Sequence, residues 1–542
     1  MEKLPLGIQN IRKIIENGYV YVDKTQYVYN LINTQSYYFL SRPRRFGKSL
    51  LLDTIAEAFS GDRELFKGLF IYDSDYSFEK HPVVRLDMSN IANETPEILK
   101  DELSIALKER AKKEGFSIDY SRPSAILKTL IEALYVKYDK RVVVLIDEYD
   151  KPMLDRLAST ETAEANRDVL RGFYGVLKSM DPFLQFTFIT GVTKFTKTSI
   201  FSGLNNLRDI TLARKYANIC GITTDDLDKY FSGYIKDLAR HERFERYGNL
   251  RDSILAWYDG YSWDGETRVI NPFSLLGFFC EERFSGFWYA SGTPAFLINL
   301  IKQKPSSFLA LNEIEISERV LDNFDIRKMS IAPLLFQTGY LTVAETRYRE
   351  DSESYLLKIP NLEVREAFYL NIITEFTETE ENYTESAYWQ IKESLKTGNL
   401  QSMLETLKGL FASIPYQLHI SHEYYYHSIF YAIMNLLGFD IDAEVSVSEG
   451  RIDGVLEIDD KVYIMEFKYK DCPSDVTLEI KNRLVKEALE KGMRQLEDRG
   501  YCKKYSGSGK TIYQAAFAFL GRDDIELLTH QFQDHSSIML PT

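Results

Sequence analysis

A short basic stretch near the N-terminus has the residue types of a phosphate-binding site. The sequence SRPRRFGKS, Ser41–Ser49, ends in Gly47-Lys48-Ser49, as does the phosphate-loop motif G-x-x-x-x-G-K-[ST]. Counting back from Gly47 places Arg42 where the motif has its first glycine. Because the motif is incomplete, a basic turn before a core helix is the alternative interpretation of this stretch.

The flanking sequence favours a nucleotide site. A β-prone run, Tyr37–Leu40, precedes the stretch, and apolar residues at helical spacing follow it: Leu51, Leu52, Ile55, Ala58 and Phe59. The loop would then lie at a helix N-terminus, where free N–H groups and the helix dipole attract phosphate. Lys48 would contact the β- and γ-phosphates, and the Ser49 hydroxyl would hold Mg²⁺.

A second acidic motif follows an apolar run. Residues Val142–Ile146 have the composition of a buried parallel strand, and Asp147 and Glu148 come directly after them. In a phosphate-loop ATPase, Asp147 would hold the Mg²⁺ shell and Glu148 would polarise the attacking water. Solvated carboxylates at the tip of an ordinary strand are the alternative. The presence of both motifs in one chain favours the ATPase interpretation.

A third strand candidate, Phe183–Thr190, ends in small polar residues. In a doubly wound sheet the strand ends at one edge face the ligand. Thr190 is therefore predicted to sense the γ-phosphate, with Thr193 and Lys194 as alternatives. A strand-end hydroxyl that is simply hydrogen-bonded is an equally open interpretation.

The C-terminal part carries a different set of chemical groups. Two strands are predicted on either side of an Asp459-Asp460 turn. Glu466 and Lys468 are two residues apart and share a face of the second strand, and the hairpin can bring Asp453 beside them. Two carboxylates form a hard-oxygen site for Mg²⁺ or Mn²⁺, and Lys468 could orient water or stabilise transition-state charge. A polar hairpin edge is the alternative.

Composition limits the class of protein. The chain has 542 residues, of which 44% are hydrophobic and 27% charged, so we expect two or three globular domains. No long apolar run or signal core is present, so we expect no membrane span. Four cysteines without C-x-x-C spacing favour the reducing cytoplasm over a zinc cluster. The net charge of −14 excludes a generally basic DNA-coating protein but allows a local basic groove.

Residues 5 to about 300 resemble the bacterial AAA-ATPase-like proteins, a phosphate-loop group related to AAA+ and STAND ATPases. The matching stretches are YVDKT (Tyr21–Thr25), RPRRFGKS (Arg42–Ser49), LIDEYDKP (Leu145–Pro152), ITGVTKF (Ile189–Phe195), SIFSGLNNL (Ser199–Leu207), DGYSW (Asp259–Trp263) and INPFSLL (Ile270–Leu276). That family has RPRRFGKS as its loop, so the missing glycine is a family trait. The resemblance implies an ATP and Mg²⁺ site at Gly47, Lys48 and Ser49, with Arg44 and Arg45 as further phosphate-facing or DNA-facing charges.

Residues 421 to about 521 resemble the PD-(D/E)XK nuclease-like domain that accompanies this ATPase family. The matching pieces are Glu423, Tyr426 and His427 in E-x-x-Y-H, Gly450-Arg451-x-Asp453-Gly454, Glu466-Phe467-Lys468, and Gln495 on a later helix. The resemblance implies Asp453 and Glu466 as metal ligands, and Lys468, Glu423 and Gln495 as catalytic residues. Ile452 stands where the strict motif has proline. For His427, a packed, hydrogen-bonded side chain is favoured over a phosphate contact.

The predicted fold class is α/β. We expect a phosphate-loop ATPase domain with a parallel sheet at 1–220 and a helical lid or winged-helix-like region at 221–310. A mostly helical connector is expected at 311–410, and an α/β PD-(D/E)XK restriction-endonuclease-like domain at 411–530.

Two functions from different classes remain. The first is an ATP-hydrolysing ATPase coupled to a metal-dependent nuclease that acts on DNA. The second is a STAND-like signalling or scaffold ATPase whose nuclease-like domain only binds nucleic acid or is regulatory. The intact set Asp453, Glu466 and Lys468 favours the first. DNA is the expected partner, although the sequence leaves RNA and a homo-oligomer open and identifies no protein partner.

Overall fold

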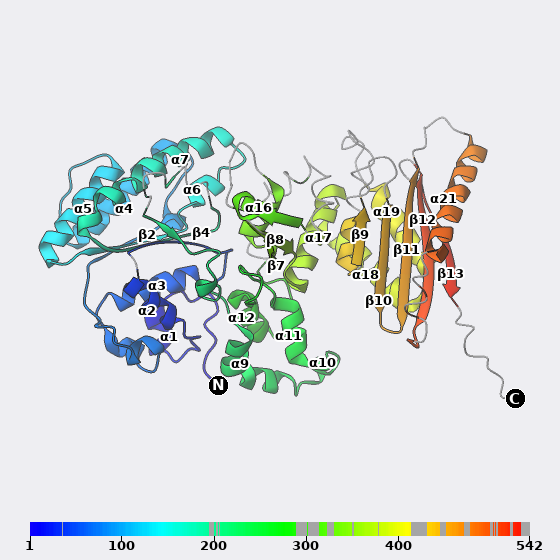
Figure 1. The fold of residues 1–542 in the computed structure, drawn as a ribbon, viewed down its shortest axis with the longest axis horizontal. Helices are drawn as coiled ribbons and strands as arrows, with labels where there is room; N and C mark the ends of the chain where they lie inside the picture. Colours follow the sequence, from blue (N-terminus) through cyan, green and yellow to red (C-terminus); the bar gives the residue numbers. More distant parts are fainter. Residues whose placement is uncertain are drawn as a thin grey trace. The chain divides into compact units, whose positions relative to one another are not determined.

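The fold is taken from a computed structural model (Figure 1). It describes residues 1–34, 36–194, 206–288, 314–321, 330–349, 352–377, 379–413, 431–438, 440–444, 451–470, 477–498, 508–520 and 524–532, with a few isolated positions (200, 201, 204, 301, 502 and 505). The chain forms two compact units, one made of residues 1–296 and 311–364 and the other of residues 297–310 and 365–542. No helix within these described ranges is both long enough and apolar enough to cross a membrane.

The first unit is built on a five-stranded parallel sheet with the order β2-β3-β4-β1-β5. Its strands are β1 (Tyr37–Ser41), β2 (Val83–Asp87), β3 (Val142–Asp147), β4 (Leu184–Gly191) and β5 (Arg208–Asp209). Every residue of β1 and β3 is buried, as expected for strands covered on both faces. The parallel sheet predicted for this part of the chain is confirmed.

Helices cover both faces of this sheet. One face has α1 (Ile11–Glu16), α2 (Thr25–Thr34) and α3 (Lys48–Ala58). Figure 1 shows α4 (Pro96–Lys113), α5 (Pro123–Tyr138) and α7 (Thr160–Tyr174) on the other face. The short helices α6 (Lys151–Leu154) and α8 (Val176–Ser179) complete the layer. The carboxyl ends of the parallel strands, where ligands bind in such sheets, lie at one edge.

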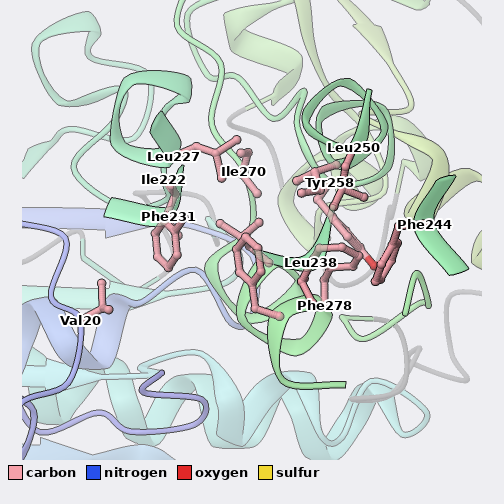
Figure 2. Packing of buried hydrophobic residues seen from close by; sticks show 13 residues of the cluster. Val20, Ile222, Leu227, Phe231, Leu238, Phe244, Leu250, Tyr258, Ile270 and Phe278 are labelled. Carbon is pink, nitrogen blue, oxygen red and sulfur yellow. The ribbon is translucent and has the colours of Figure 1, made fainter. Parts of the chain in front are cut away.

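The expected helical middle region is confirmed. It contains α9 (Thr224–Leu238), α10 (Glu242–Glu245), α11 (Leu250–Tyr258) and α12 (Pro272–Glu281). A capping box begins α9, since the Thr223 and Asp226 side chains each accept from the other's backbone N–H. Aromatic and aliphatic side chains from all four helices pack together (Figure 2), with Phe231 stacked on Phe279 at 5.5 Å between ring centroids. Val20, from the N-terminal segment, belongs to the same core.

The expectation that residues 311–410 are mostly helical is wrong for their first half. Residues 314–358 contain an antiparallel sheet, β6-β8-β7, made of β6 (Ile314–Ser317), β7 (Thr342–Arg349) and β8 (Ser352–Lys358), with the short helices α15 (Glu318–Leu321) and α16 (Ile331–Thr338). Charged and polar side chains pair across this sheet. Arg347 lies 3.1 Å from Glu315, and Ser354 donates to the same carboxylate at 2.6 Å.

The second unit begins with helices and ends with a mixed sheet. Three helices, α17 (Leu362–Thr377), α18 (Glu381–Thr397) and α19 (Leu400–Ala412), precede a sheet with the order β13-β12-β11-β10-β9. The first residues of α17, Leu362–Val364, belong to the first unit. These strands are β9 (Asp440–Glu444), β10 (Arg451–Ile458), β11 (Lys461–Lys470), β12 (Thr511–Leu520) and β13 (Asp524–Phe532). The long helix α21 (Leu478–Asp498) connects the parallel pair β11 and β12, and its residues Met493 and Leu496 pack on them. The predicted α/β fold of this region is confirmed.

Candidate nucleotide and nuclease sites

The predicted phosphate loop lies between β1 and α3, as the sequence indicates. Gly47 is the N-cap of α3 and has a φ of 87°, in the left-handed region that favours glycine. Lys48 is buried, and its ammonium donates to the carbonyls of Arg42 and Pro43 at 2.9 Å each. Burial lowers the pKa of Lys48, while Asp147 and Glu148 oppose this shift. The loop therefore curls around its own lysine, which lies close to the acidic end of β3.

Arg42, which replaces the first glycine of the motif, is a structural residue. Its side chain is fully buried, and its guanidinium donates to the carbonyls of Ser41 and Thr211 at 2.9 Å and of Tyr216 at 3.1 Å. The same group lies 3.9 Å above the ring of Trp263. Burial lowers its pKa to about 10. A glycine here could not make these contacts, so the loop is held by a different means from that of the standard motif.

The rest of the loop is fixed by aromatic side chains from the middle region. Phe46 is buried and lies edge-on to Tyr261 and Trp263, with ring centroids 4.7 and 5.4 Å away. Arg45 has a φ of 67°, and its guanidinium lies 4.8 Å from the ring of Phe273. The stretch DGYSW thus forms part of the loop's support, a role that the sequence alone did not indicate.

A cavity of about 330 Å³ opens at this loop. Four cationic side chains and one carboxylate line it, namely Arg44, Arg45, Lys48, Lys151 and Glu148. Ser49, Ser89 and Gln9 add polar side chains, and the other lining residues are Pro5, Gly7, Ile8, Gly47, Leu50, Pro272, Phe273 and Leu276. Its volume is at the lower end of the range for small-molecule sites. The excess of positive charge suits a phosphorylated ligand.

The acidic pair at the end of β3 is held in a defined geometry. Asp147 is buried and accepts a 2.5 Å hydrogen bond from the Thr190 hydroxyl and a 3.1 Å bond from the Glu148 N–H. Glu148 has a φ of 50°, which is uncommon for a residue other than glycine. Burial raises the pKa of Glu148, and the charge of Lys48 opposes the rise.

The predicted strand-end residues have partners within the protein. Thr190 is fully buried, and its hydroxyl donates to Asp147 rather than lining the cavity. Thr193 donates to Asp150 at 2.6 Å, and Lys194 forms a 2.8 Å ion pair with Asp209. The structure thus brings Thr190 to the predicted Mg²⁺ ligand, and its role towards the γ-phosphate stays a prediction.

Sequence reasoning missed two residues near this site, Asp150 and Lys151. Asp150 is fully buried and accepts from the N–H groups of Val192 and Thr193, so it ties the end of β4 to the start of α6. Lys151 lines the cavity beside Glu148. The signal was present in the sequence, since both residues follow the acidic motif directly, but the partners of Asp150, Val192 and Thr193, follow another strand.

Four of the predicted nuclease positions lie on described elements: Asp453 is on β10, Glu466 and Lys468 are on β11, and Gln495 is on α21. Glu466 is fully buried, and the Lys468 ammonium lies 2.5 Å from its Oε1 atom. The backbone register pairs Asp453 directly with Glu466, so the two positions share a face of the sheet. The side chain of Asp453 lies outside the described residues. So do Glu423, Tyr426 and His427.

Helix α21 covers the face of the sheet that carries Glu466. A Cβ atom at Gly492 would lie 3.0 Å from the Cβ of Ala516 and 3.6 Å from the Cγ of Glu466, so the helix is closely packed on this carboxylate. Gln495 is one turn further along the helix, and its Oε1 atom is buried without a hydrogen-bond partner among the described residues. Sequence reasoning identified Gln495 but missed Gly492, whose role depends on the packing distance.

Comparisons with known proteins agree with this arrangement. A family model described as predicted AAA-ATPase matches residues 5–201, and one for the PD-(D/E)XK nuclease superfamily matches residues 421–526. The chain is also 36% identical, over 525 residues, to an uncharacterized protein in the vnfD 5′ region of Azotobacter chroococcum mcd 1. The aligned region covers 96% of each protein. The chain belongs to the AAA-ATPase-like family. Its C-terminal part is a PD-(D/E)XK superfamily domain.

The first unit also contains a buried acid that the sequence did not single out. Glu363, at the start of α17, is 1% exposed, and its Oε1 atom accepts from the Trp288 N–H at 2.8 Å. Its Oε2 atom has no hydrogen-bond partner among the described residues. Burial raises the pKa of Glu363 to about 7, and the bond from Trp288 opposes part of this rise.

Replacing Glu363 by glutamine should change how stability depends on pH. Between its ordinary pKa of about 4.3 and about 7, folded Glu363 keeps a proton that the unfolded chain has released, so its contribution to stability falls as the pH rises through this window. Glu363→Gln replaces the titrating carboxyl group by an amide that does not ionise. Relative to wild type, the variant should gain roughly 2–3 kcal/mol between pH 5 and pH 8 in urea unfolding.

The matched control is Glu161→Gln, because Glu161 is exposed in the first turn of α7. This variant should follow the wild-type pH dependence. If Glu363→Gln does so as well, the carboxyl group titrates in the folded protein as it does in water, and the account of its burial is wrong.

Proposed function

We propose that the chain is an ATP-hydrolysing enzyme whose nucleotide site controls a metal-dependent nuclease that acts on DNA. The observation that carries the nucleotide half is the cavity at Gly47–Ser49, where four cationic side chains surround one carboxylate, Glu148. A basic turn without a ligand would not need to enclose such a cavity. The nuclease half rests on the PD-(D/E)XK match and on Glu466 and Lys468 beneath α21.

In the nucleotide site, each residue has a distinct task. Lys48 would exchange its bonds to the loop carbonyls for contacts with the β- and γ-phosphates, which carry more charge. The N–H groups at the start of α3 would bind phosphate oxygens, and Arg44 and Arg45 would add positive charge at the cavity wall. Glu148 would take up the proton of the attacking water, and its raised pKa makes it a stronger base than an exposed carboxylate.

The donor set at the loop suits Mg²⁺. The Ser49 hydroxyl and the Asp147 carboxylate are hard oxygen ligands, and Thr190 orients Asp147 through its Oδ1 atom. Bound there, Mg²⁺ would neutralise charge that develops on the phosphates. Asp147 is buried away from bulk water, so keeping its carboxylate charged costs free energy unless an opposite charge lies nearby. A bound cation would supply that charge.

Lys48→Ala should abolish ATP binding while leaving the fold intact. The substitution removes the main cation facing the phosphates, and the loop keeps the separate anchor provided by Arg42. The measurement is a calorimetric titration with MgATP, accompanied by a thermal melt. An ATP affinity equal to that of the wild type would contradict the phosphate-loop assignment.

Glu148→Gln should retain ATP but stop its hydrolysis. The amide preserves the size of the side chain, whereas it cannot accept the proton of the attacking water. Phosphate release under saturating ATP measures turnover, and the same titration measures binding. Turnover at the wild-type rate would show that another group activates the water.

In the nuclease site, the residues again fit a divalent cation. Asp453 and Glu466 occupy paired backbone positions, so their carboxylates would supply two hard oxygen ligands if both faced the same metal. A metal held there would act as a Lewis acid on the phosphodiester. Lys468 would orient water or stabilise transition-state charge, and Gln495, whose buried Oε1 lacks a partner among the described residues, would orient water or phosphate. Glu423 remains a predicted further catalytic residue.

Asp453→Ala and Lys468→Ala should each abolish cleavage for different reasons. Losing an electrostatic contact such as that of Lys468 costs about 10²–10³ in rate. The metal should still bind without Lys468, but should bind weakly or not at all without Asp453. Calorimetry with Mn²⁺ beside a plasmid-cleavage assay separates the two effects.

Two controls complete this test. Lys470→Ala removes a lysine of the same strand that lies beyond the paired carboxylate positions, and it should leave cleavage unchanged. The same cleavage assay with RNA of the same length shows whether DNA or RNA is the substrate. If wild type cleaves nothing with or without ATP, the scaffold function, in which this domain only binds nucleic acid or is regulatory, replaces the nuclease.

We also place this activity in the cytoplasm. Cys220, Cys280 and Cys502 are free thiols, and Cys280 is exposed; an exposed free thiol persists in a reducing compartment. Activity measured with a reductant present should therefore represent the native state.

A further inference from the structure

Trp288 is held in one orientation by residues that lie far from it in the sequence. Its backbone N–H donates to Glu363, and its ring lies 5.2 Å from that of Tyr340 in an edge-on arrangement. A Cβ atom at Gly339 would lie 3.2 Å from the indole, so the backbone at the end of α16 approaches the ring closely. The indole is 6% exposed. Glu363 thus holds the backbone of Trp288, while Tyr340 and Gly339 pack against its indole ring.

This tryptophan contacts the phosphate loop directly. Its indole N–H donates to the carbonyl of Arg44 at 3.2 Å. Gly339 approaches the same part of the loop, because a Cβ atom there would lie 2.8 Å from the Cβ of Pro43. The carbonyl of Pro43, in turn, accepts from Lys48. Trp288 therefore holds the loop at Arg44, and Gly339, which packs against Trp288, holds it at Pro43.

We propose that Trp288 is a positioning residue of the nucleotide site and that Glu363 acts on this site through Trp288. The inference rests on the proposed function, since it concerns affinity for ATP. Neither residue lines the cavity, so neither would touch the nucleotide. Trp288 fixes the peptide between Arg44 and Arg45, and with it the direction from which both arginines enter the cavity. Glu363 fixes Trp288 from the first turn of α17.

The arrangement links nucleotide binding to the start of α17. Asn361 accepts from the Val364 N–H at 3.0 Å and so caps this helix, and Glu363 follows within the first turn. Any change that draws Glu363 away from Trp288 would release the Arg44 carbonyl. By linkage, a nucleotide that needs the loop in this position would favour the capped, anchored form of the helix.

Trp288→Phe tests the inference with one lost hydrogen bond. Phenylalanine keeps a ring beside Tyr340 but cannot donate to Arg44. MgATP should bind roughly 3–10-fold more weakly, the loss expected for one neutral hydrogen bond. Trp389→Phe is the matched control, since Trp389 is 56% exposed on α18, and it should bind ATP like the wild type. The nucleotide-induced change in tryptophan fluorescence should be reduced in Trp288→Phe and kept in the control.

A double-variant cycle tests the role of Glu363. Glu363→Ala removes the acceptor for the Trp288 N–H and should weaken ATP binding, whereas Glu363→Gln retains an acceptor and should not. Because Glu363 acts through Trp288, the effects of Glu363→Ala and Trp288→Phe should not add. Additive losses would overturn the relay, and unchanged ATP affinity in Trp288→Phe would overturn the positioning role even if Glu363→Ala fails to fold.

The Lys48→Ala variant separates this inference from the proposed function. If wild type binds ATP, Lys48→Ala does not, and Trp288→Phe equals wild type, only the positioning role is wrong. If wild type does not bind ATP at all, the proposed function and the inference are wrong together.

Discussion

Burial of the Arg42 guanidinium is the constraint on which the nucleotide site depends. A charged group removed from water needs hydrogen bonds to compensate its lost hydration. Arg42 finds them in backbone carbonyls at the end of β1 and in the segment after β5, and in the ring face of Trp263. These segments must converge on one point. The loop is therefore fixed by an internal anchor where the standard motif relies on the freedom of glycine.

The other features of the site follow from that anchor. Once Arg42 points inward, the chain must turn back to place Gly47 at the start of α3, and it does so through a left-handed Arg45. The turn leaves Phe46 to be covered by Tyr261 and Trp263. Stretches such as DGYSW, far along the sequence, are thus part of the phosphate loop's structure. The middle region therefore packs against the loop beside the cavity where nucleotide would bind.

Some parts of this account could be predicted from the sequence. Apolar runs bounded by polar residues predict β1, β3 and the β10–β11 hairpin, because those patterns depend on local periodicity. The pairing of positions 453 and 466 follows from the tight turn at Asp459-Asp460, which fixes the register. Spacing on a helix likewise predicts that Gln495 can face the sheet. Local rules of this kind need no knowledge of the rest of the chain.

Other parts could not be predicted, since they depend on contacts between distant residues. For the Thr190 hydroxyl, the sequence leaves a phosphate-sensing role and a hydrogen bond within the protein equally open, because its bond to Asp147 depends on the neighbouring arrangement of β3 and β4. The sheet β6-β8-β7 lies in a stretch expected to be mostly helical, and one of its ion pairs joins Arg347 on β7 to Glu315 on another strand. Gly492 had no signal, as a glycine within a helix has meaning only once the packing distance to Glu466 is known.

The central claim is that this arginine-anchored loop is a preformed ATP site. Its most direct test is an experimental structure of the chain with Mg²⁺ and a non-hydrolysable ATP analogue. We predict that the phosphates lie against the N–H groups of Gly47–Ser49 and the ammonium of Lys48, while Arg42 keeps its bonds to Thr211 and Tyr216. A nucleotide bound elsewhere, or an Arg42 side chain that leaves its buried position to contact phosphate, would contradict the account.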